Sequence, residues 1–521
     1  MMLCCQRVLG WGRFALLWGC VLVCGTARGA GVTLITHGYG GNVADWVIPM
    51  CNQIPLRSDF PGTNHTRYQF SITRSGNLLY TTVTLLGGGD PLTSDSGEII
   101  IALDWSTLSS LGGASSSEIA AEAAEALLAS NLIPALGGRR LAELPLHLIG
   151  HSRGASVVAE MARELGAVGV WVEHQTTLDP YPVNLLGDPG TMRNYANVFY
   201  ADNYWQNRDF PAGKSLAGAY NRYLPELSGG YASGQNHSDT HLWYHGTVDG
   251  NTPAGDNLAT ITSAQRSTWW TALEQAGTNA GFRYSLIGGG DRFSSQEPNG
   301  PGNGRINDGV NRKWDLGAGA GANRTSLPAN SGAWPNLVRL NLAGTNVVVS
   351  GQPVPIALYY QLGAAPAATG SLSLYLDLDA NPYNENETEL LNCTLSGTGP
   401  NAVAALSTNA QPNPAAIMPR TYRLFGRLAD GSRARYLYAP QTITLTPSLQ
   451  APTLLDPVWQ GNQFRFTLAA MPGQRIVIQR TPDFQTWTPV VTNVMRGPSA
   501  QIILSASSAD PPGFYRALLT P

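Results

Sequence analysis

The sequence predicts an α/β unit built on a mostly parallel sheet, followed by all-β, sandwich-like modules. Up to about residue 286, apolar runs of strand length alternate with longer runs of helical periodicity, which is typical of a parallel sheet covered on both faces. Beyond Trp334 the pattern changes to short alternating runs bounded by turn residues, which indicates sandwich strands. A strand, a tight turn and a helix are expected to meet at Ser152, which lies where such sheets place their chemistry.

Residues 1–29 are expected to be a secretory signal peptide. Two arginines precede an apolar run over residues 14–23, and small residues at 27–29 supply a cleavage site. A membrane anchor is the alternative, but the run is short for a span and a strand is expected from Val32. We therefore expect export to the extracellular space or cell surface, with the periplasm as an alternative, and no integral membrane segment after cleavage.

The composition excludes several classes of partner and site. Charged residues make up only 13% of the chain and the net charge is −3, so no basic surface indicates nucleic-acid binding. Of the six cysteines, only Cys51 and Cys393 lie outside the predicted signal peptide. We therefore expect neither a disulfide framework nor a cysteine metal site, and whether these two pair stays open.

The α/β unit is expected over residues 30–286. A capping box at Ser115 and Glu118 predicts the start of an alanine-rich helix. Strands are predicted at residues 32–36, 79–86, 99–103, 144–149, 168–177 and 197–200, and helices at 115–130, 155–165 and 260–277.

The rest of the chain is expected to hold a linker and two β modules. Residues 287–333 are dominated by Gly, Asn and Pro without periodicity, which predicts a linker. An Ig-like β-sandwich is expected over residues 334–450 and a shorter β module over 451–521. Sandwich strands are predicted at residues 337–342, 357–361, 371–376, 422–428 and 442–445.

Residues Gly150 to Gly154 read Gly-His-Ser-Arg-Gly and carry the clearest sign of chemistry. They lie between an apolar strand and a helix, which is the context of a nucleophile elbow. The glycines allow the backbone to close up, and the N–H groups at the helix start favour developing negative charge. The sequence therefore predicts Ser152 as a nucleophile.

A serine nucleophile needs an acid and a base, and both are expected after it in the chain. Asp179, at the end of the next predicted strand, and Asp202, one strand later, are the two candidate acids. The histidines that follow both aspartates are His237, His241 and His245. His241 and His245 are four residues apart, as metal ligands on a helix are, but no third ligand at suitable spacing accompanies them.

The oxyanion of the reaction is expected to be held by two backbone N–H groups. The first belongs to Arg153, the residue after the nucleophile. The second belongs to Tyr39, in the glycine-rich turn that follows the first predicted strand.

The order of these motifs resembles the lipase superfamily of α/β-hydrolases, including the pancreatic-lipase type. His-Gly-Tyr at residues 37–39, the elbow at 150–154, Leu-Asp-Pro at 178–180 and Asn-His at 236–237 follow one another as in that family. The resemblance covers about residues 31–285. It departs from the family in that the disulfides of the animal enzymes cannot form and an arginine follows the serine.

The resemblance implies a catalytic triad of Ser152, Asp179 and His237, with Tyr39 and Arg153 as oxyanion donors. His241 is the alternative base. The implied activity is that of a secreted lipase or esterase, which cleaves an ester or lipid substrate through an acyl-enzyme without a cofactor. Acyl transfer or peptide cleavage by the same triad is an alternative, as is a non-catalytic adhesion or carbohydrate-binding protein.

Two further segments invite a function. Residues 203–235 are rich in aromatic side chains, which predicts a lid, an acyl-binding wall or a packed loop. The region beyond Trp334 resembles accessory modules of large secreted bacterial proteins, which implies contact with a cell surface or a polysaccharide. There, Asp377 and Asp379 begin a run of oxygen ligands suited to a structural calcium, although a polar hairpin loop is the favoured alternative.

Overall fold

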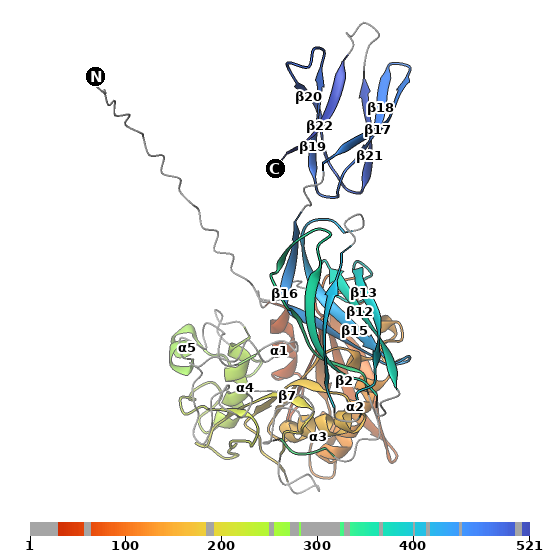
Figure 1. Cartoon of the computed structure of the whole chain (residues 1–521). Coiled ribbons are helices and arrows are strands. Elements are labelled where there is room, and N and C mark those ends of the chain that lie inside the picture. Colours follow the sequence, from red (N-terminus) through yellow and green to blue (C-terminus); the bar gives the residue numbers. More distant parts are fainter. Residues whose placement is uncertain are drawn as a thin grey trace, which may run out of the picture.

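The computed structural model describes residues 30–56, 64–183, 192–248, 255–270, 281–282, 324–327, 334–363, 368–399, 402–412, 417–446, 451–505 and 513–520. The predicted signal peptide and most of the predicted linker lie outside these residues. In Figure 1 the chain runs from an α/β unit through a β-sandwich to a small β module that carries the C-terminus.

The α/β unit is built on an eight-stranded sheet with the strand order β3-β2-β4-β1-β5-β6-β7-β8. Every neighbouring pair is parallel except β2 and β3, which form an antiparallel pair at one edge. The inner strands β1, β5, β6 and β7 are buried along their whole length, as expected for parallel strands covered on both faces. The strands are β1 (Val32–Thr36), β2 (Thr66–Ser75), β3 (Leu78–Gly87), β4 (Ile99–Asp104), β5 (Leu146–His151), β6 (Val172–Leu178), β7 (Val198–Trp205) and β8 (Tyr220–Tyr223).

Helices cover both faces of this sheet. Neighbouring residues of β1 point to opposite sides: Leu34 joins the core beneath α2 and α3, and Ile35 joins the core beneath α1, α4 and α5. The predicted capping box opens α2, because Ser115 Oγ accepts from the backbone N–H of Glu118 at 3.2 Å. The helices are α1 (Val47–Gln53), α2 (Ser116–Leu128), α3 (Arg153–Ala167), α4 (Asn236–Gly246) and α5 (Ser263–Trp269), with short 3₁₀ turns η1 (Ile54–Leu56), η2 (Ser106–Leu108), η3 (Pro134–Leu136) and η4 (Leu141–Glu143).

The β-sandwich consists of a five-stranded sheet, β10-β16-β15-β12-β13, and a three-stranded sheet, β14-β11-β9. The predicted strands are present, and β10, β13 and β14 are additional. The strands are β9 (Asn336–Leu342), β10 (Val347–Val349), β11 (Val354–Gln361), β12 (Thr369–Asp377), β13 (Thr388–Ser396), β14 (Ala404–Ala410), β15 (Thr421–Ala429) and β16 (Ala434–Thr446).

The sandwich packs directly against the α/β unit, and a single apolar core contains residues of both. Arg435 of β16 is buried in this interface and donates to the carbonyl oxygens of Ala142 at 2.6 Å and Trp171 at 2.8 Å. The same guanidinium forms an ion pair with Glu173. Trp171 Nε1 donates to Gln361 Oε1 of the sandwich at 2.7 Å. These contacts join the two units firmly.

A second contact joins the sandwich to the turn before β4. Asn381 Nδ2 donates to the carbonyl oxygens of Pro91 at 2.9 Å and Ser94 at 2.8 Å. The backbone N–H of Gly97 donates to the carbonyl oxygen of Ala380 at 3.2 Å.

The C-terminal module consists of two three-stranded sheets, β17-β18-β21 and β20-β19-β22. Its buried core is small and consists of Phe466, Leu468, Ile476, Ile478, Met495 and Ile502. Among the described residues of the whole chain, no helix combines the length and the apolarity needed to cross a membrane. The strands are β17 (Thr453–Gln460), β18 (Gln463–Ala469), β19 (Arg475–Thr481), β20 (Thr488–Val494), β21 (Ser499–Ser505) and β22 (Phe514–Thr520).

Candidate active site

Ser152 occupies the turn between β5 and α3 in a strained backbone conformation. Its φ is 56° and its ψ is −122°. A non-glycine residue at positive φ costs of order 1–3 kcal/mol and persists where the surroundings hold it. The backbone N–H of Ser152 donates to the carbonyl oxygen of Leu178, the residue before Asp179, at 2.9 Å. The turn therefore lies directly beside the end of β6.

Three glycines allow this turn to form. A Cβ atom on Gly150 would lie 2.2 Å from the carbonyl oxygen of Gly154, and one on Gly154 would lie 2.3 Å from that of His37. A Cβ atom on Gly38 would lie 2.7 Å from Cβ of Ser152. The glycines are therefore required by close approach, and they bring the turn after β1 against the serine.

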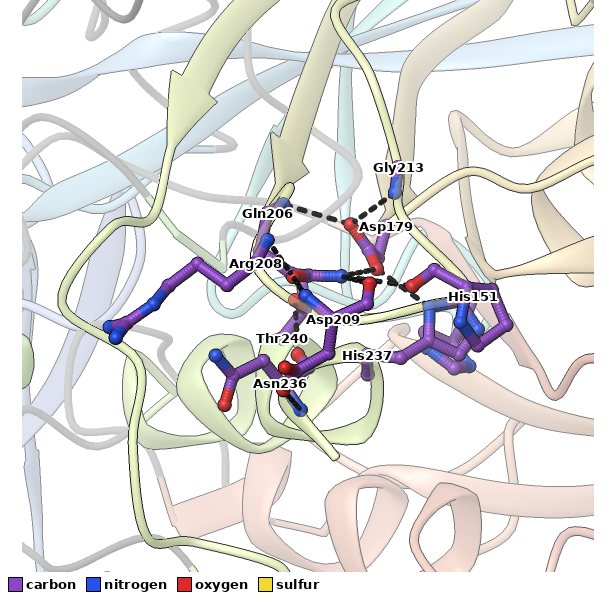
Figure 2. Close-up of polar contacts among 10 residues, drawn as sticks. His151, Asp179, Gln206, Arg208, Asp209, Gly213, Asn236, His237 and Thr240 are labelled. Carbon is purple, nitrogen blue, oxygen red and sulfur yellow. Dashed lines mark hydrogen bonds and ion pairs between the residues drawn. The ribbon is translucent and has the colours of Figure 1, made fainter. Parts of the chain in front are cut away.

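Asp179 and His237 contact each other beside this turn. His237, in the first turn of α4, places Nδ1 at 2.6 Å from Asp179 Oδ2 (Figure 2). The carboxylate is fully buried, and 14% of the histidine side chain is exposed. Because Nδ1–H donates to the carboxylate, Nε2 is the nitrogen that can accept a proton.

The Asp179 carboxylate receives three more hydrogen bonds. The backbone N–H of Gln206 donates to Oδ1 at 2.8 Å, and Gln206 Nε2 donates to Oδ2 at 2.8 Å. The backbone N–H of Gly213 donates to Oδ1 at 3.1 Å. Gln206 was not predicted from the sequence. The available signal was a polar residue directly after β7, the strand that pairs with β6, at whose end Asp179 lies.

Asp202, the alternative acid, lies elsewhere than expected. The strand predicted to end at residue 200 continues to Trp205, so Asp202 is inside β7 and not in a loop after it. Its carboxylate accepts from His174 Nε2 at 2.9 Å, Thr176 Oγ1 at 2.5 Å and Tyr204 Oη at 2.9 Å. Asp202 therefore belongs to a buried network within the sheet, whereas Asp179 contacts His237.

His241, the alternative base, faces a different aspartate. His245 Nδ1 lies 2.7 Å from Asp256 and His241 Nδ1 lies 3.2 Å from it, while Tyr231 donates to the same carboxylate at 2.8 Å. Although burial opposes it, the contacts with both histidines lower the pKa of Asp256 to about 2. The His241 ring also stacks on Trp46 with ring centroids 4.3 Å apart.

His151, which sequence reasoning passed over, links the elbow to α4. Its Nε2 donates to the carbonyl oxygen of His237 at 2.9 Å. Its ring lies 4.5 Å from that of His237 and 4.8 Å from that of His241, measured between centroids. Burial and the neighbouring imidazoles hold the pKa of His151 well below its usual value. A neutral His151 therefore holds the start of α4 beside Ser152.

The two predicted oxyanion donors both lie near Ser152. Arg153 is its neighbour in the chain, and Tyr39 follows the strand that pairs with β5. Arg153 is the first residue of α3, where a backbone N–H has no intrahelical acceptor. Tyr39 follows Gly38, and β1 is paired with β5, so both turns share one sheet edge. The turn is anchored by His37, whose ring stacks on Trp105 at 5.0 Å between centroids.

The side chain of Arg153 makes structural contacts, which explain why an arginine can follow the serine at this position. Arg153 is fully buried and donates to the carbonyl oxygens of Ser109 at 3.0 Å and Ala114 at 2.6 Å. Its guanidinium also lies over the Trp105 ring, 5.1 Å from the centroid. The side chain fixes the segment after η2, and the backbone N–H stays at the helix start.

Most of the aromatic segment at residues 203–235 is core. Tyr204, Tyr220 and Leu224 are completely buried. Phe210 is 80% exposed, and its ring meets that of Tyr181 edge-on, 5.6 Å between centroids. The backbone N–H of Tyr181 lies 3.4 Å from the carbonyl oxygen of Ser152, so the residue that packs against Phe210 is a backbone neighbour of Ser152.

The loop predicted to be suited to calcium is filled by protein donors. Tyr438 donates to Asp377, whose pKa burial raises to about 6. Asn384 at 2.9 Å and Asn386 at 2.7 Å donate to Asp379. Within the described residues, no group of three or more His, Cys, Asp or Glu side chains is arranged to hold a metal ion. Calcium binding stays a prediction.

The two cysteines outside the predicted signal peptide are both free. Cys51 is buried, and burial raises the pKa of its thiol to about 12. It is therefore an unreactive thiol at neutral pH.

Comparison with known proteins leaves the family of this chain open. No family model and no curated protein matches it. Solved structures that it resembles over part of its length include the CARDB domain of the PF1109 protein from Pyrococcus furiosus, at 15% identity over 22% of this chain and 90% of that one, with a TM-score of 0.15. The C-terminal domain of wzt matches at 9% identity over 22% and 75%, with a TM-score of 0.17. The catalytic domain of the LPMO Lmo2467 from Listeria monocytogenes matches at 25% identity over 20% and 58%, with a TM-score of 0.13.

Proposed function

We propose that this protein is a secreted serine hydrolase of the α/β-hydrolase type that cleaves carboxylic esters. The observation that carries the proposal is the contact of 2.6 Å between His237 Nδ1 and Asp179 beside a serine held at positive φ. Ser152 and Asp179 are neighbours because the Ser152 N–H binds Leu178. Ser152 and His237 are neighbours because His151 binds the His237 carbonyl oxygen. These contacts converge on one sheet edge.

The proposed fold type is supported by the place of each element. The nucleophile follows β5 on a strand–turn–helix passage, and the acid follows β6, the next strand in the sheet. The turn with Tyr39 follows β1, on the other side of β5. Because parallel strands end at the same edge, all three turns meet there. The chain order of serine, aspartate and histidine is that of α/β-hydrolases.

The arrangement supports a two-step mechanism. His237 Nε2 takes the proton from Ser152 Oγ as the oxygen bonds to the ester carbonyl carbon, and Asp179 stabilises the imidazolium. The backbone N–H groups of Tyr39 and Arg153 bind the oxyanion. The carbon–oxygen bond to the alcohol then breaks, and the alcohol leaves with the proton from His237. In the second step water gives a proton to His237, its oxygen bonds to the acyl carbon, and the acid leaves as Ser152 regains its proton.

The surface beside the nucleophile favours an apolar group on the substrate. The exposed Phe210 packs against the half-buried Tyr181, whose backbone N–H contacts the carbonyl oxygen of Ser152. An exposed phenyl ring gains about 25 cal/mol per Å² of apolar surface that a ligand covers. We therefore propose esters with an apolar acyl or alcohol group as the substrate class.

Hydrolysis of p-nitrophenyl esters of increasing acyl length tests this function. Ser152→Ala, Asp179→Asn and His237→Ala should each lose activity, the first completely. The matched control is Ser156→Ala, because Ser156 is also buried in α3, one turn further on, and its hydroxyl has no partner within the described structure. Equal rates for wild type and Ser152→Ala on every ester would refute the proposal and favour a non-catalytic binding role.

A further inference from the structure

We infer that Gln206 is a positioning residue for the acid of the proposed triad, within a segment, residues 206–213, that holds the acid and the base together. We call residues 206–213 the frame segment; the inference rests on the proposed function. Gln206 follows directly after β7 and is fully buried. Its backbone N–H and its Nε2 each donate to an oxygen of Asp179 at 2.8 Å (Figure 2). One residue therefore contacts both oxygens of the carboxylate that binds His237.

The orientation of the Gln206 amide is fixed by its remaining contacts. Oε1 accepts from the backbone N–H groups of Arg208 at 2.7 Å and Asp209 at 3.0 Å. Because only the carbonyl end of an amide can accept these bonds, Nε2 must face Asp179. Nε2 also donates to the carbonyl oxygens of Asp209 at 3.2 Å and Pro211 at 3.0 Å. These contacts hold Gln206 Nε2 in the orientation that donates to Asp179, before the reaction begins.

The frame segment also contacts the helix that carries the base. Asp209 Oδ2 accepts from the backbone N–H of Asn236, the first residue of α4, at 3.1 Å. A carboxylate is favoured there because first-turn N–H groups lack intrahelical acceptors. His237 is the next residue, so this contact fixes the start of the helix relative to Gln206. Acid and base are therefore positioned by the same short segment.

A neutral donor suits this position better than a cationic one. The carboxylate must keep its negative charge in order to stabilise the imidazolium that forms on His237. A lysine or arginine would compete for that charge, whereas an amide orients both oxygens and leaves the charge unchanged. We therefore expect Gln206 to act on kcat by orienting Asp179 and to have little effect on substrate binding.

The test compares Gln206 variants of the whole protein in ester hydrolysis, with kcat and KM measured over a range of pH. Gln206→Met keeps the volume of the side chain and removes the donor. We expect kcat to fall by about 10-fold or more, which is less than the roughly 10⁴-fold loss when a triad acid is replaced by its amide. KM should change by about twofold or less, because the lost contact acts in the transition state.

Gln206→Glu supplies a signature that a structural role would not produce. It places a second carboxyl group beside Asp179, and two carboxyls this close share one proton. The protonated form donates to Asp179 and restores the contact, whereas the ionised form repels it. The ratio of variant to wild-type kcat should therefore fall as the pH rises. The titratable groups around this pair, His237, His151 and Asp209, are present in both proteins, so a pH dependence of the ratio originates from the introduced carboxyl group.

Gln175→Met is the matched control. Gln175 is also buried and donates to Asn194 at 2.8 Å, away from the triad. This variant should keep the wild-type kcat even if it loses stability. On the frame segment, Asp209→Ala should lower kcat, and Asp209→Asn should restore most of it because an acceptor oxygen remains for the start of α4.

The proton resonance of His237 Nδ1–H gives a readout without turnover. A short bond to a carboxylate moves it far downfield, and we expect it to shift and exchange faster in Gln206→Met. If Ser152→Ala is as active as wild type, the proposed function fails, and this resonance alone decides whether the frame segment holds the pair. If Gln206→Met equals Gln175→Met in kcat and leaves the resonance unchanged, the frame segment is overturned while the triad stands.

Discussion

Histidines of helix α4 contact two different aspartates, and the two places have very different surroundings. His237, in its first turn, lies 2.6 Å from Asp179 and keeps 14% of its side chain exposed. His245, about two turns further on, lies 2.7 Å from Asp256 and is 3% exposed. The first contact borders a strained serine, and the second is enclosed. Exposure and a neighbouring nucleophile, more than the pair itself, therefore mark the candidate active site.

Two further enclosed pairs extend this comparison. His174 and Asp202 lie 2.9 Å apart inside the sheet, and both are fully buried. Arg435 and Glu173 form an ion pair between the sandwich and the α/β unit. Enclosed pairs hold elements together, because a buried charge without its partner is costly. In the proposed mechanism, the accessible pair at the sheet edge exchanges protons with the substrate.

The largest expected effect is on activity, and it distinguishes the two aspartates, Asp179 and Asp256, that contact histidines of α4. Asp179→Asn should lower kcat by about 10⁴-fold, because the amide favours the wrong tautomer of His237. Asp256→Asn should lower stability and leave kcat within about threefold of wild type. Ester hydrolysis at saturating substrate measures both. An equally large loss of kcat in a folded Asp256→Asn protein would remove the distinction.

Breaking the enclosed ion pair of Arg435 and Glu173 should lower the stability of the protein. Arg435→Met leaves Glu173 buried without its partner, and we expect a loss of about 3–5 kcal/mol in the free energy of unfolding. Burial already raises the pKa of Glu173, and loss of the arginine raises it further. When the pKa of a carboxyl group is higher in the folded than in the unfolded chain, the protein becomes less stable as the pH rises. The deficit in urea unfolding should therefore be larger at pH 8 than at pH 5, and a deficit below about 1 kcal/mol would contradict this role.

The buried histidines predict a loss of stability in mild acid. Burial lowers the pKa values of His151 and His241 below the usual 6.5, so the unfolded chain binds more protons. Their contribution is complete above pH 6.5 and is lost as the pH falls from there, by up to about 1.4 kcal/mol per pH unit for each histidine. Asp239, whose pKa burial raises to about 6, offsets part of this loss from about pH 6 downward, because the folded chain binds that proton before the unfolded chain does. Urea unfolding measured over this pH range should show that the free energy of unfolding depends less steeply on pH in His151→Gln than in wild type. Equal pH dependence in the two proteins would exclude His151 as a cause of the acid-induced loss of stability.

The smallest expected effect concerns substrate choice at the accessible pair. Phe210→Ser removes an exposed ring next to Tyr181 and should lower kcat/KM for long-chain esters by about 3- to 10-fold. Acetyl esters should be unaffected, because a short acyl group leaves that ring uncovered. A series of p-nitrophenyl esters gives the ratio directly. An equal loss for all chain lengths would place Phe210 outside the substrate site.

The parts of the fold that local patterns specify were predictable from the sequence. The apolar runs of β1, β4 and β5, the capping box of α2 and the glycine-bounded turn at Ser152 each depend on neighbouring residues. Asp179 was predictable because it directly ends a buried strand. A mostly parallel sheet followed by β modules is confirmed, and the hydrolase assignment stays a proposal.

The features that the sequence did not reveal depend on distant partners. The predicted strand end at residue 200 was wrong because Asp202 and Asn203 are polar, yet both are buried against hydrogen-bond partners on β6. Strand β2 was missed because it alternates buried and half-exposed residues with many polar side chains. Gln206 lies in no motif, and Arg435 lies outside the strand that was predicted at residues 442–445. Their roles appear only when the fold brings Asp179 and Glu173 to them.

Covalent labelling with a fluorophosphonate, located by mass spectrometry of the peptides, tests the central claim most directly. This reagent phosphonylates a serine that a neighbouring base activates. We predict a single adduct, at Ser152, in the folded wild-type protein, unchanged in Ser156→Ala and lost in His237→Ala and in urea. No adduct in the folded protein, or an adduct on a different serine, would contradict the assignment of Ser152 and His237 as nucleophile and base.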